Sequence, residues 1–275
     1  MKQLFSLHKI SVSGFAIILF STASAGQSWL LPAGAAETGM NHSCIMKSGF
    51  WSAFQNQALL PHYQSFACGI NYENRFSISE LATRSVAVIV PAGKAGLGAF
   101  YRHFGYHDLR RHTAGIACGL KLSEKISAGV QIDYLAERTY GEYDERESLT
   151  FEVGIYSMLT DKIRLGMHLY NPVPGSIRKN YLPSSIRAGA GILLSRSLFA
   201  GAEVEMRTGM EPLIRMGIEY EAIKDFRIRG GFSSENTSFS LGIGYVMKLI
   251  RIDLGFATHE LLGVTSSASI IFKIK

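Results

Sequence analysis

From about Tyr63 to its last residue the chain alternates apolar and polar residues, and no helical period interrupts this pattern. Between Leu198 and Met206 every second residue is apolar, and Glu203 and Glu205 lie among the positions in between. Successive side chains of a β-strand point to opposite faces, so each such segment has one apolar face and one charged face. The pattern predicts an all-β fold made of many amphipathic strands.

Two all-β architectures present such strands. A water-soluble sandwich turns the charged faces outward, whereas an outer-membrane barrel turns the apolar faces toward lipid and the charged faces toward its lumen. The joints between the strands alternate in length: 91–94 and 123–125 are short, while 137–147 and 171–184 are long. Short turns at one end and long loops at the other are typical of a barrel. We therefore predict a transmembrane antiparallel β-barrel.

The alternating segments number about fourteen, an even number that returns the chain to its starting side, as single-chain bacterial barrels require. The predicted strands are 63–73, 84–91, 94–103, 111–121, 125–138, 147–158, 162–171, 184–194, 197–207, 211–221, 225–234, 237–248, 249–257 and 264–274.

Residues 1–25 have the features of a secretory signal peptide. Lys2 and Lys9 precede and flank a short apolar stretch, and Ala23-Ser24-Ala25 fits a cleavage site. An uncleaved N-terminal anchor helix is the alternative. The predicted organisation is a signal peptide at 1–25, a lead-in or hatch at 26–62 and the barrel at 63–275, located in the bacterial outer membrane with its lipid as a partner.

Composition narrows the function classes. The net charge of +6 comes from residues spread along strands and turns, with no basic helix and no RNA-binding motif, so we expect no nucleic acid partner. Three cysteines do not make a disulfide scaffold, and their spacing suits no metal. His103, His107 and His112 leave a metal site in one loop as the weaker alternative. We predict no enzyme activity, no metal and no cofactor.

The inward faces of the predicted strands carry charges of both signs, which can pair across neighbouring strands. The preferred interpretation is a salt-bridged lumen wall, and the alternative is a path for ions or substrates. The residues of this predicted charge network are Glu203, Glu205, Arg215, Glu219, Glu221, Arg227 and Arg229. Many inward positions are glycine, which either leaves room for another segment inside the barrel or relieves crowding of the strands.

The segment from Gly49 to Pro61 precedes the first strand and is rich in aromatic residues without a period of two. We expect it to form a short helix or hatch inside the barrel and to close the lumen to ions. Asn56 is expected to bond the backbone near the turn into the first strand. The residues that this hatch would bury, and that could form a hydrophobic pocket, are Phe50, Trp51, Phe54 and Leu59.

Trp51 to Leu60 resembles the W-x-x-F-x-N-P-A-x-L element that precedes the first strand of FadL-like outer-membrane proteins, especially those of the PorV/PorQ-type group. The segments 34–40 and 259–265 resemble other parts of that group. The resemblance implies a fourteen-stranded barrel with an N-terminal hatch. The chain departs from the pattern at Gln57, which replaces proline, and at Lys275, where barrels usually end on an aromatic residue.

Two functions follow as hypotheses. The resemblance to the PorV/PorQ-type group, together with short loops, favours a subunit of a larger outer-membrane assembly for protein secretion or barrel biogenesis, with other outer-membrane or periplasmic subunits as partners. The alternative is a FadL-like transporter of hydrophobic small molecules, which the predicted hatch supports.

Overall fold

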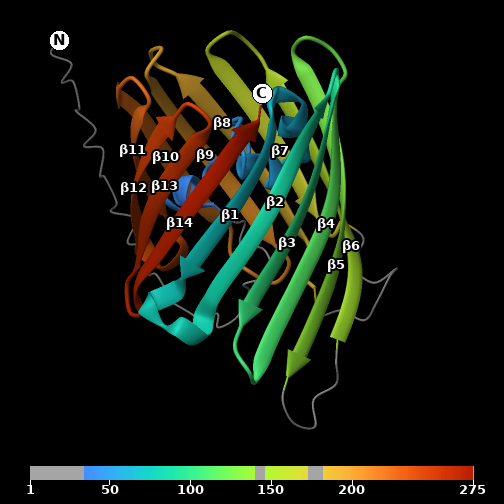
Figure 1. Cartoon of the computed structure of the whole chain (residues 1–275), viewed down its shortest axis with the longest axis vertical. Helices are drawn as coiled ribbons and strands as arrows, with labels where there is room; N and C mark the ends of the chain where they lie inside the picture. Colours follow the sequence, from blue (N-terminus) through green and yellow to red (C-terminus); the bar gives the residue numbers. More distant parts are fainter. Residues whose placement is uncertain (1–33, 140–145, 173–181, 275) are drawn as a thin grey trace, which may run out of the picture. The chain divides into compact units, whose positions relative to one another are not determined.

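The computed structural model describes residues 34–139, 146–172 and 182–274. Its dominant feature is one closed sheet of fourteen antiparallel strands, in which each strand pairs with its neighbours in sequence (Figure 1). The first and last strands close the barrel, with Phe66 opposite Ile274 and Asn74 opposite Ser266. The prediction of a fourteen-stranded antiparallel barrel is confirmed.

The strands are β1 (Phe66–Asn74), β2 (Ala82–Ala92), β3 (Ala95–Gly105), β4 (Leu109–Lys121), β5 (Ile126–Thr139), β6 (Arg146–Met158), β7 (Ile163–Tyr170), β8 (Ser185–Leu193), β9 (Leu198–Arg207), β10 (Leu213–Ile223), β11 (Phe226–Ser233), β12 (Ser238–Met247), β13 (Ile250–His259) and β14 (Gly263–Ile274). Each lies within a few residues of its predicted range.

The period of two decides which side chains face the lumen. On β5, Val130 and Ile132 are exposed on the outer surface, whereas Gln131 and Asp133 between them are buried inside. Apolar side chains outside and polar side chains inside are the reverse of a soluble protein and suit a wall that lies in lipid. The pairing is regular except for a register shift between Glu221 and Ile223.

The two ends of the barrel differ in the length of their connections. At one end the strands join through short turns, such as the two residues between β2 and β3 or between β12 and β13. At the other end lie the longer connections, which include the short 3-10 helices η4 (Arg75–Ser77) and η5 (Ser79–Leu81) and, between β11 and β12, η6 (Glu235–Thr237). By the rule for bacterial barrels, the short turns face the periplasm.

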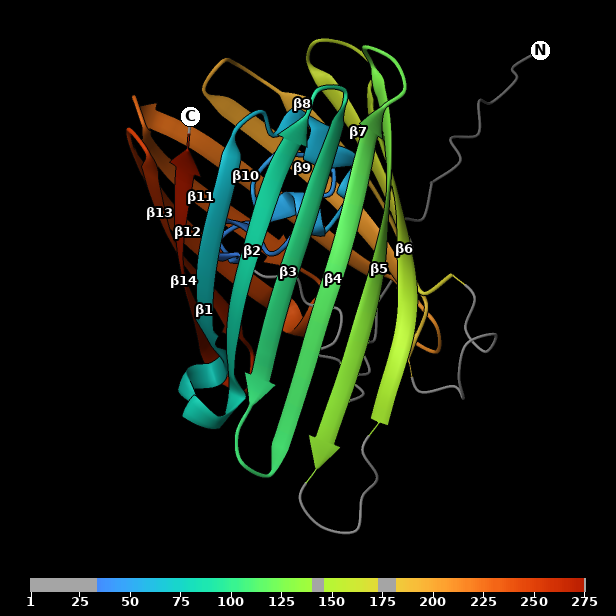
Figure 2. The ribbon, with the colours of Figure 1, turned by 45° about the vertical axis from the view of Figure 1, so that its right-hand side comes forward.

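The segment 34–62 lies inside the barrel, and we call it the hatch (Figure 2). It contains the helix α1 (Ala35–Thr38) and the 3-10 helices η2 (Ser52–Phe54) and η3 (Gln57–His62). α1 packs on β12, β13 and β14, whereas η3 packs on β2 to β6. Among the described residues, no helix has the length and apolarity to cross a membrane.

Candidate functional site

The hatch and the lumen wall around it form the candidate site. The side of the hatch near β1 to β6 is built on an aromatic cluster: Phe50 meets Trp51 edge-on at 5.0 Å between ring centroids, and Phe54 at 6.1 Å. Phe50 and Trp51 are almost completely buried, and Leu59 is completely so, while Phe54 is partly buried. Aromatic pairs in such offset contacts add stability beyond their buried area.

The part of the lumen wall that packs against this cluster is apolar, although lumen walls are usually polar. Ala67 of β1, Ile89 of β2 and Ala117 of β4 face inward and are buried against the hatch. Phe100 of β3 extends the aromatic contacts, with its ring centroid 5.5 Å from that of Phe54. We call the apolar inward residues of β1 to β4 around η3 the apolar wall.

Inward glycines let the hatch backbone approach this wall closely. A Cβ on Gly129 would lie 2.4 Å from the carbonyl carbon of Gln57, and one on Gly119 would lie 2.3 Å from its oxygen. On the far side, a Cβ on Gly166 would lie 2.5 Å from the oxygen of Ile45. No Cβ fits at such distances without displacing backbone. Of the two interpretations of the inward glycines, room for a segment inside the barrel therefore holds at these positions.

Asn56 holds the hatch together where η3 begins. Its side-chain oxygen accepts from the backbone N–H of Ala58 at 3.2 Å, which caps η3. Its Nδ2 donates to the carbonyl of Ile45 within the hatch at 2.7 Å and to that of Ile155 on β6 at 3.1 Å. One buried amide thus joins two parts of the hatch to each other and to the wall.

Gln57 links the hatch to a buried polar group on the wall. Its Nε2 lies 2.5 Å from Glu152 Oε2, and His168 Nε2 lies 2.9 Å from the same carboxylate oxygen. The proline expected at this position by resemblance has no side-chain donor. The departure at Gln57 therefore gives this hatch a hydrogen bond that the family pattern lacks.

The inward faces of β8 to β13 carry a network of ion pairs, which we call the charged wall. Arg215 Nη1 lies 3.2 Å from Glu203 Oε1 and also pairs with Glu205. Arg229 Nε lies 2.6 Å from Glu219 Oε2. Four of these five residues are buried, and the side chain of Glu219 is nearly so. Buried charges are tolerated when they are paired in this way.

The hatch contacts the charged wall through polar groups. Lys47 Nζ lies 3.1 Å from Glu219 Oε1, and Arg187 Nη2 donates to the carbonyl of His42 at 2.8 Å. Burial lowers the pKa of Lys47, against the opposing pull of the Glu219 carboxylate. Methionines add a small apolar contact: Met46 packs near Phe199 of β9.

The structure brings the residues of the predicted charge network together and gives each an ion-pair partner; Arg227 Nη2, for example, lies 3.3 Å from Glu221 Oε2. Sequence reasoning missed Arg187, Asp253 and Arg251, which extend the network. All three occupy inward positions of the same period of two, so that signal could have found them. Lys47 lies in the irregular hatch, where no period indicates which way a side chain points.

His103, His107 and His112 do not share one loop, because His103 lies on β3, His112 lies on β4 and only His107 lies between these strands. His107 Nδ1 lies 2.7 Å from Asp108 Oδ1, whereas His103 and His112 face each other on the outer surface of the barrel. Within 34–139, 146–172 and 182–274, no group of three or more His, Cys, Asp or Glu side chains is placed to hold a metal ion.

Comparison with known proteins identifies the fold. No protein-family model and no curated protein matches the chain. The toluene transporter TodX of Pseudomonas putida is similar in structure, with a TM-score of 0.67 at 11% identity over 89% of this chain and 99% of that one. A FadL homologue of Pseudomonas aeruginosa gives 0.58 at 12% identity over 88% and 97%. The Acinetobacter baumannii outer membrane protein Omp33 gives 0.52 at 10% over 77% and 98%.

At these identities the likeness establishes the fold alone, which is that of FadL-like outer-membrane barrels. It does not show the narrower PorV/PorQ grouping. It also contradicts the first functional hypothesis, a secretion or assembly subunit, because the similar structures include a toluene transporter and a FadL homologue. That hypothesis gave more weight to three short segments, 34–40, 51–60 and 259–265, and to the short loops than to the barrel and hatch, which suit the alternative hypothesis.

Proposed function

We propose that this chain carries small hydrophobic molecules across the bacterial outer membrane, with the hatch as the part that moves. The observation that carries the proposal is a hatch folded inside a FadL-like barrel, with its aromatic cluster packed on the apolar wall. TodX, which has this fold, is a toluene transporter. A permeant that passes along Phe50, Phe54 and Phe100 meets aromatic side chains throughout, as suits an apolar solute rather than an ion.

The contacts of the hatch allow movement. Hydrogen bonds, the ion pair of Lys47 and side-chain packing hold it against the wall. Its cysteine, Cys44, is a free thiol, so no disulfide bond joins it to the wall. Each of the hydrogen bonds has a modest net free energy, because water replaces it on opening. Export by a cleaved signal peptide at 1–25 and contact of the outer face with membrane lipid belong to the same proposal. Partner subunits and the PorV/PorQ-type likeness stay predictions of the sequence.

Uptake by cells that lack other hydrocarbon transporters tests the proposal. Cells that produce the chain should take up radiolabelled toluene or a long-chain fatty acid several-fold faster than cells without it. Gly129→Ala should change this rate, because its Cβ would collide with the backbone of Gln57. Gly230→Ala is the matched control, since its Cβ would meet only an ordinary contact at 3.4 Å from Ile218. Equal uptake with and without the chain, for both probes, contradicts the proposal.

A further inference from the structure

Charged side chains and histidines on the outer face of the barrel gather in one sector. Among the described residues, the outward positions of β1 and of β7 to β14 carry no Asp, Glu, Lys, Arg or His. The outward positions of β2 to β5 nearest the long connections carry five, on four consecutive strands, and β6 adds one acid, Glu147. The five are Arg84, His103, Arg110, His112 and Arg138. We call this set the basic face.

The strand register places these side chains next to one another. Arg84 of β2 lies opposite His103 of β3, and His103 lies opposite His112 of β4. Arg110 and Arg138 form the next pair, nearer the loops. Arg84, His103 and His112 therefore form one row across β2 to β4. Neighbouring strands are about 4.8 Å apart, so a single ligand group can contact all three side chains of this row. The rings of His103 and His112 are 4.9 Å apart, and Arg84 and Arg110 are exposed.

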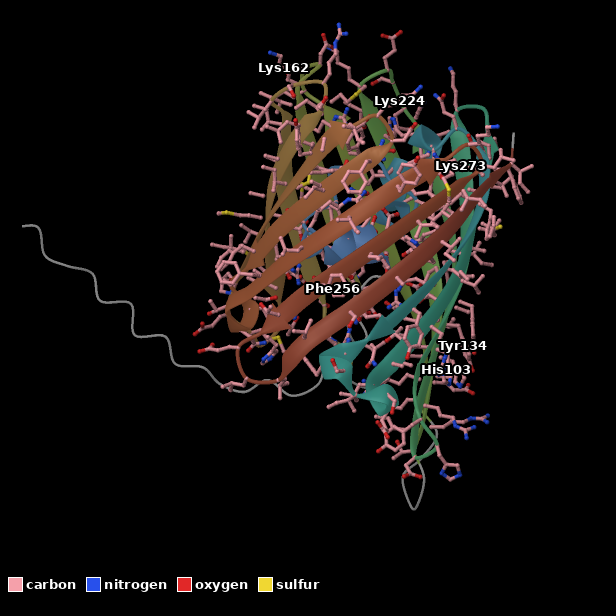
Figure 3. All side chains as sticks on the ribbon, turned by 60° about the vertical axis from the view of Figure 1, so that its left-hand side comes forward. His103, Tyr134, Lys162, Lys224, Phe256 and Lys273 are labelled. Carbon is pink, nitrogen blue, oxygen red and sulfur yellow. The ribbon has the colours of Figure 1, made fainter. Side chains whose placement is uncertain are left out.

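A row of tyrosines marks the depth of the basic face in the membrane. Tyr101 and Tyr134 lie two residues closer to the short-turn end, and both are exposed on the outer surface. The Tyr101 hydroxyl lies 2.6 Å from His112 Nδ1. Tyrosine rings gather at the boundary between hydrocarbon and headgroups. Figure 3 shows His103 and Tyr134 near the end of the barrel opposite Lys162, Lys224 and Lys273.

A charge on the lipid side of a barrel costs about 2–4 kcal/mol at the midplane and about 0–1 kcal/mol near the interfaces. The basic face is thus placed at headgroup depth, at the end with longer connections, which by the same rule is the outer leaflet. Among the described residues, Glu147 is the one acid at an outward strand position; it lies on β6 opposite Ala136, beyond the row of Arg84, His103 and His112. Arginine pairs with phosphate oxygens through two parallel hydrogen bonds.

We propose that the basic face binds the phosphate of an outer-leaflet lipid, with Arg84 and Arg110 as the charged ligands. Exposed lysines at the other end, such as Lys162 and Lys224, lie in turns rather than on the lipid-facing wall. They provide a matched control of equal charge.

Native mass spectrometry of the full chain in detergent tests the site, with diphosphoryl lipid A and its dephosphorylated form as probes. Diphosphoryl lipid A should stay bound, and the dephosphorylated lipid should not. The double variant Arg84→Gln with Arg110→Gln should bind the phosphorylated lipid about thirtyfold more weakly. Lys162→Gln with Lys224→Gln should bind it as the unchanged chain does. The shift of heated against unheated protein on a gel checks folding, and Arg110→Gln alone replaces a double variant that fails it.

Three outcomes overturn the proposal. Equal binding of the two lipid forms shows that the acyl chains alone are recognised. If both double variants lose binding of diphosphoryl lipid A equally, the net charge of the protein rather than the basic face determines the binding. Displacement of the lipid by a tenfold excess of inorganic phosphate shows a site for a free ion rather than for a lipid.

Discussion

The two walls of the lumen hold the same hatch by different physics. The apolar wall contacts it through alanine, isoleucine and aromatic side chains, and the hatch presents Phe50, Trp51 and Leu59. The charged wall contacts it through Glu219 and Arg187, and the hatch presents Lys47 and a carbonyl. Apolar burial is non-directional and scales with area, at about 25 cal/mol per Å². Ion pairs are directional and depend on every partner staying in place.

The difference suggests a division of labour. The apolar contact supplies most of the free energy that keeps the hatch inside, while the charged contact orients it. Cys44 offers a natural reporter of hatch position, because its thiol is buried in the hatch and burial raises its pKa. In a background of Cys68→Ala and Cys118→Ala, maleimide labelling of Cys44 measures how often the hatch opens.

The largest effect is expected from deletion of Gly49 to Pro61, which removes the aromatic cluster together with all of η3 except His62. The intact chain should be closed to ions in planar bilayers, and the deletion should create conductance. An intact chain that already conducts like an open porin contradicts the closed lumen. A deletion that stays closed instead shows that the charged wall suffices to block the lumen.

Trp51→Ala tests the apolar side alone. Loss of a buried tryptophan should destabilise the packing of the hatch by about 3–5 kcal/mol, because the cavity it leaves cannot collapse fully. Labelling of Cys44 should become faster by orders of magnitude. Phe239→Ala is the control, since this ring is 59% exposed on the outer surface. If labelling stays slow in both variants, the main contacts that keep the hatch inside the barrel lie elsewhere.

Lys47→Gln tests the charged side. The lost ion pair should cost about 1–3 kcal/mol, because Glu219 keeps its second partner, Arg229, at 2.6 Å. Labelling of Cys44 should rise less than in Trp51→Ala, and Lys162→Gln in an exposed turn should leave it unchanged. If Lys47→Gln opens the hatch further than Trp51→Ala does, the division of labour is reversed.

The smallest effect concerns pH at the edge of the hatch. Burial, followed by the charges of Lys121 and Arg164, lowers the pKa of His62 to about 4. The unfolded chain then binds more protons than the folded one between about pH 6.5 and 4, so the stability that neutral His62 contributes is lost as the pH falls through that range.

The labelling rate of Cys44 at each pH, divided by the thiolate fraction at that pH, should therefore rise more on acidification in the unchanged chain than in His62→Gln. The comparison isolates His62 from Glu37, whose pKa is raised by burial and which acts in the opposite direction. Parallel pH profiles of the two chains contradict the role of His62.

The strands, and the side of the sheet on which each residue lies, could be predicted because each strand has its own alternation of apolar and polar residues. Alternation on β5 or β10 needs no knowledge of the rest of the chain, and even the missed Arg187 and Asp253 sit at inward positions of the same pattern. The hatch was predictable only as an apolar aromatic segment that a barrel could shelter. Its contacts were not, because Lys47 lies on irregular backbone and Gln57 begins the short helix η3, and the direction of both side chains is set by the walls around the hatch.

The function could not be predicted correctly from the short motifs near the two ends of the chain. The motif from Trp51 to Leu60 suggested a secretion subunit, and the structural neighbours contradict this. A short motif reports how a hatch turns into the first strand, and proteins of one fold with different roles can share that turn.

By itself the sequence determined the number of strands, the side of the wall that each residue faces and the presence of an apolar segment ahead of the barrel, because each follows from local periodicity and composition. Only the tertiary structure decided that Gly129 and Gly119 receive the backbone of Gln57, that Lys47 pairs with Glu219, and that Arg84, His103 and Arg110 share one face. These pairings join residues far apart in the chain, and only the closed sheet, with its register, brings them within contact distance.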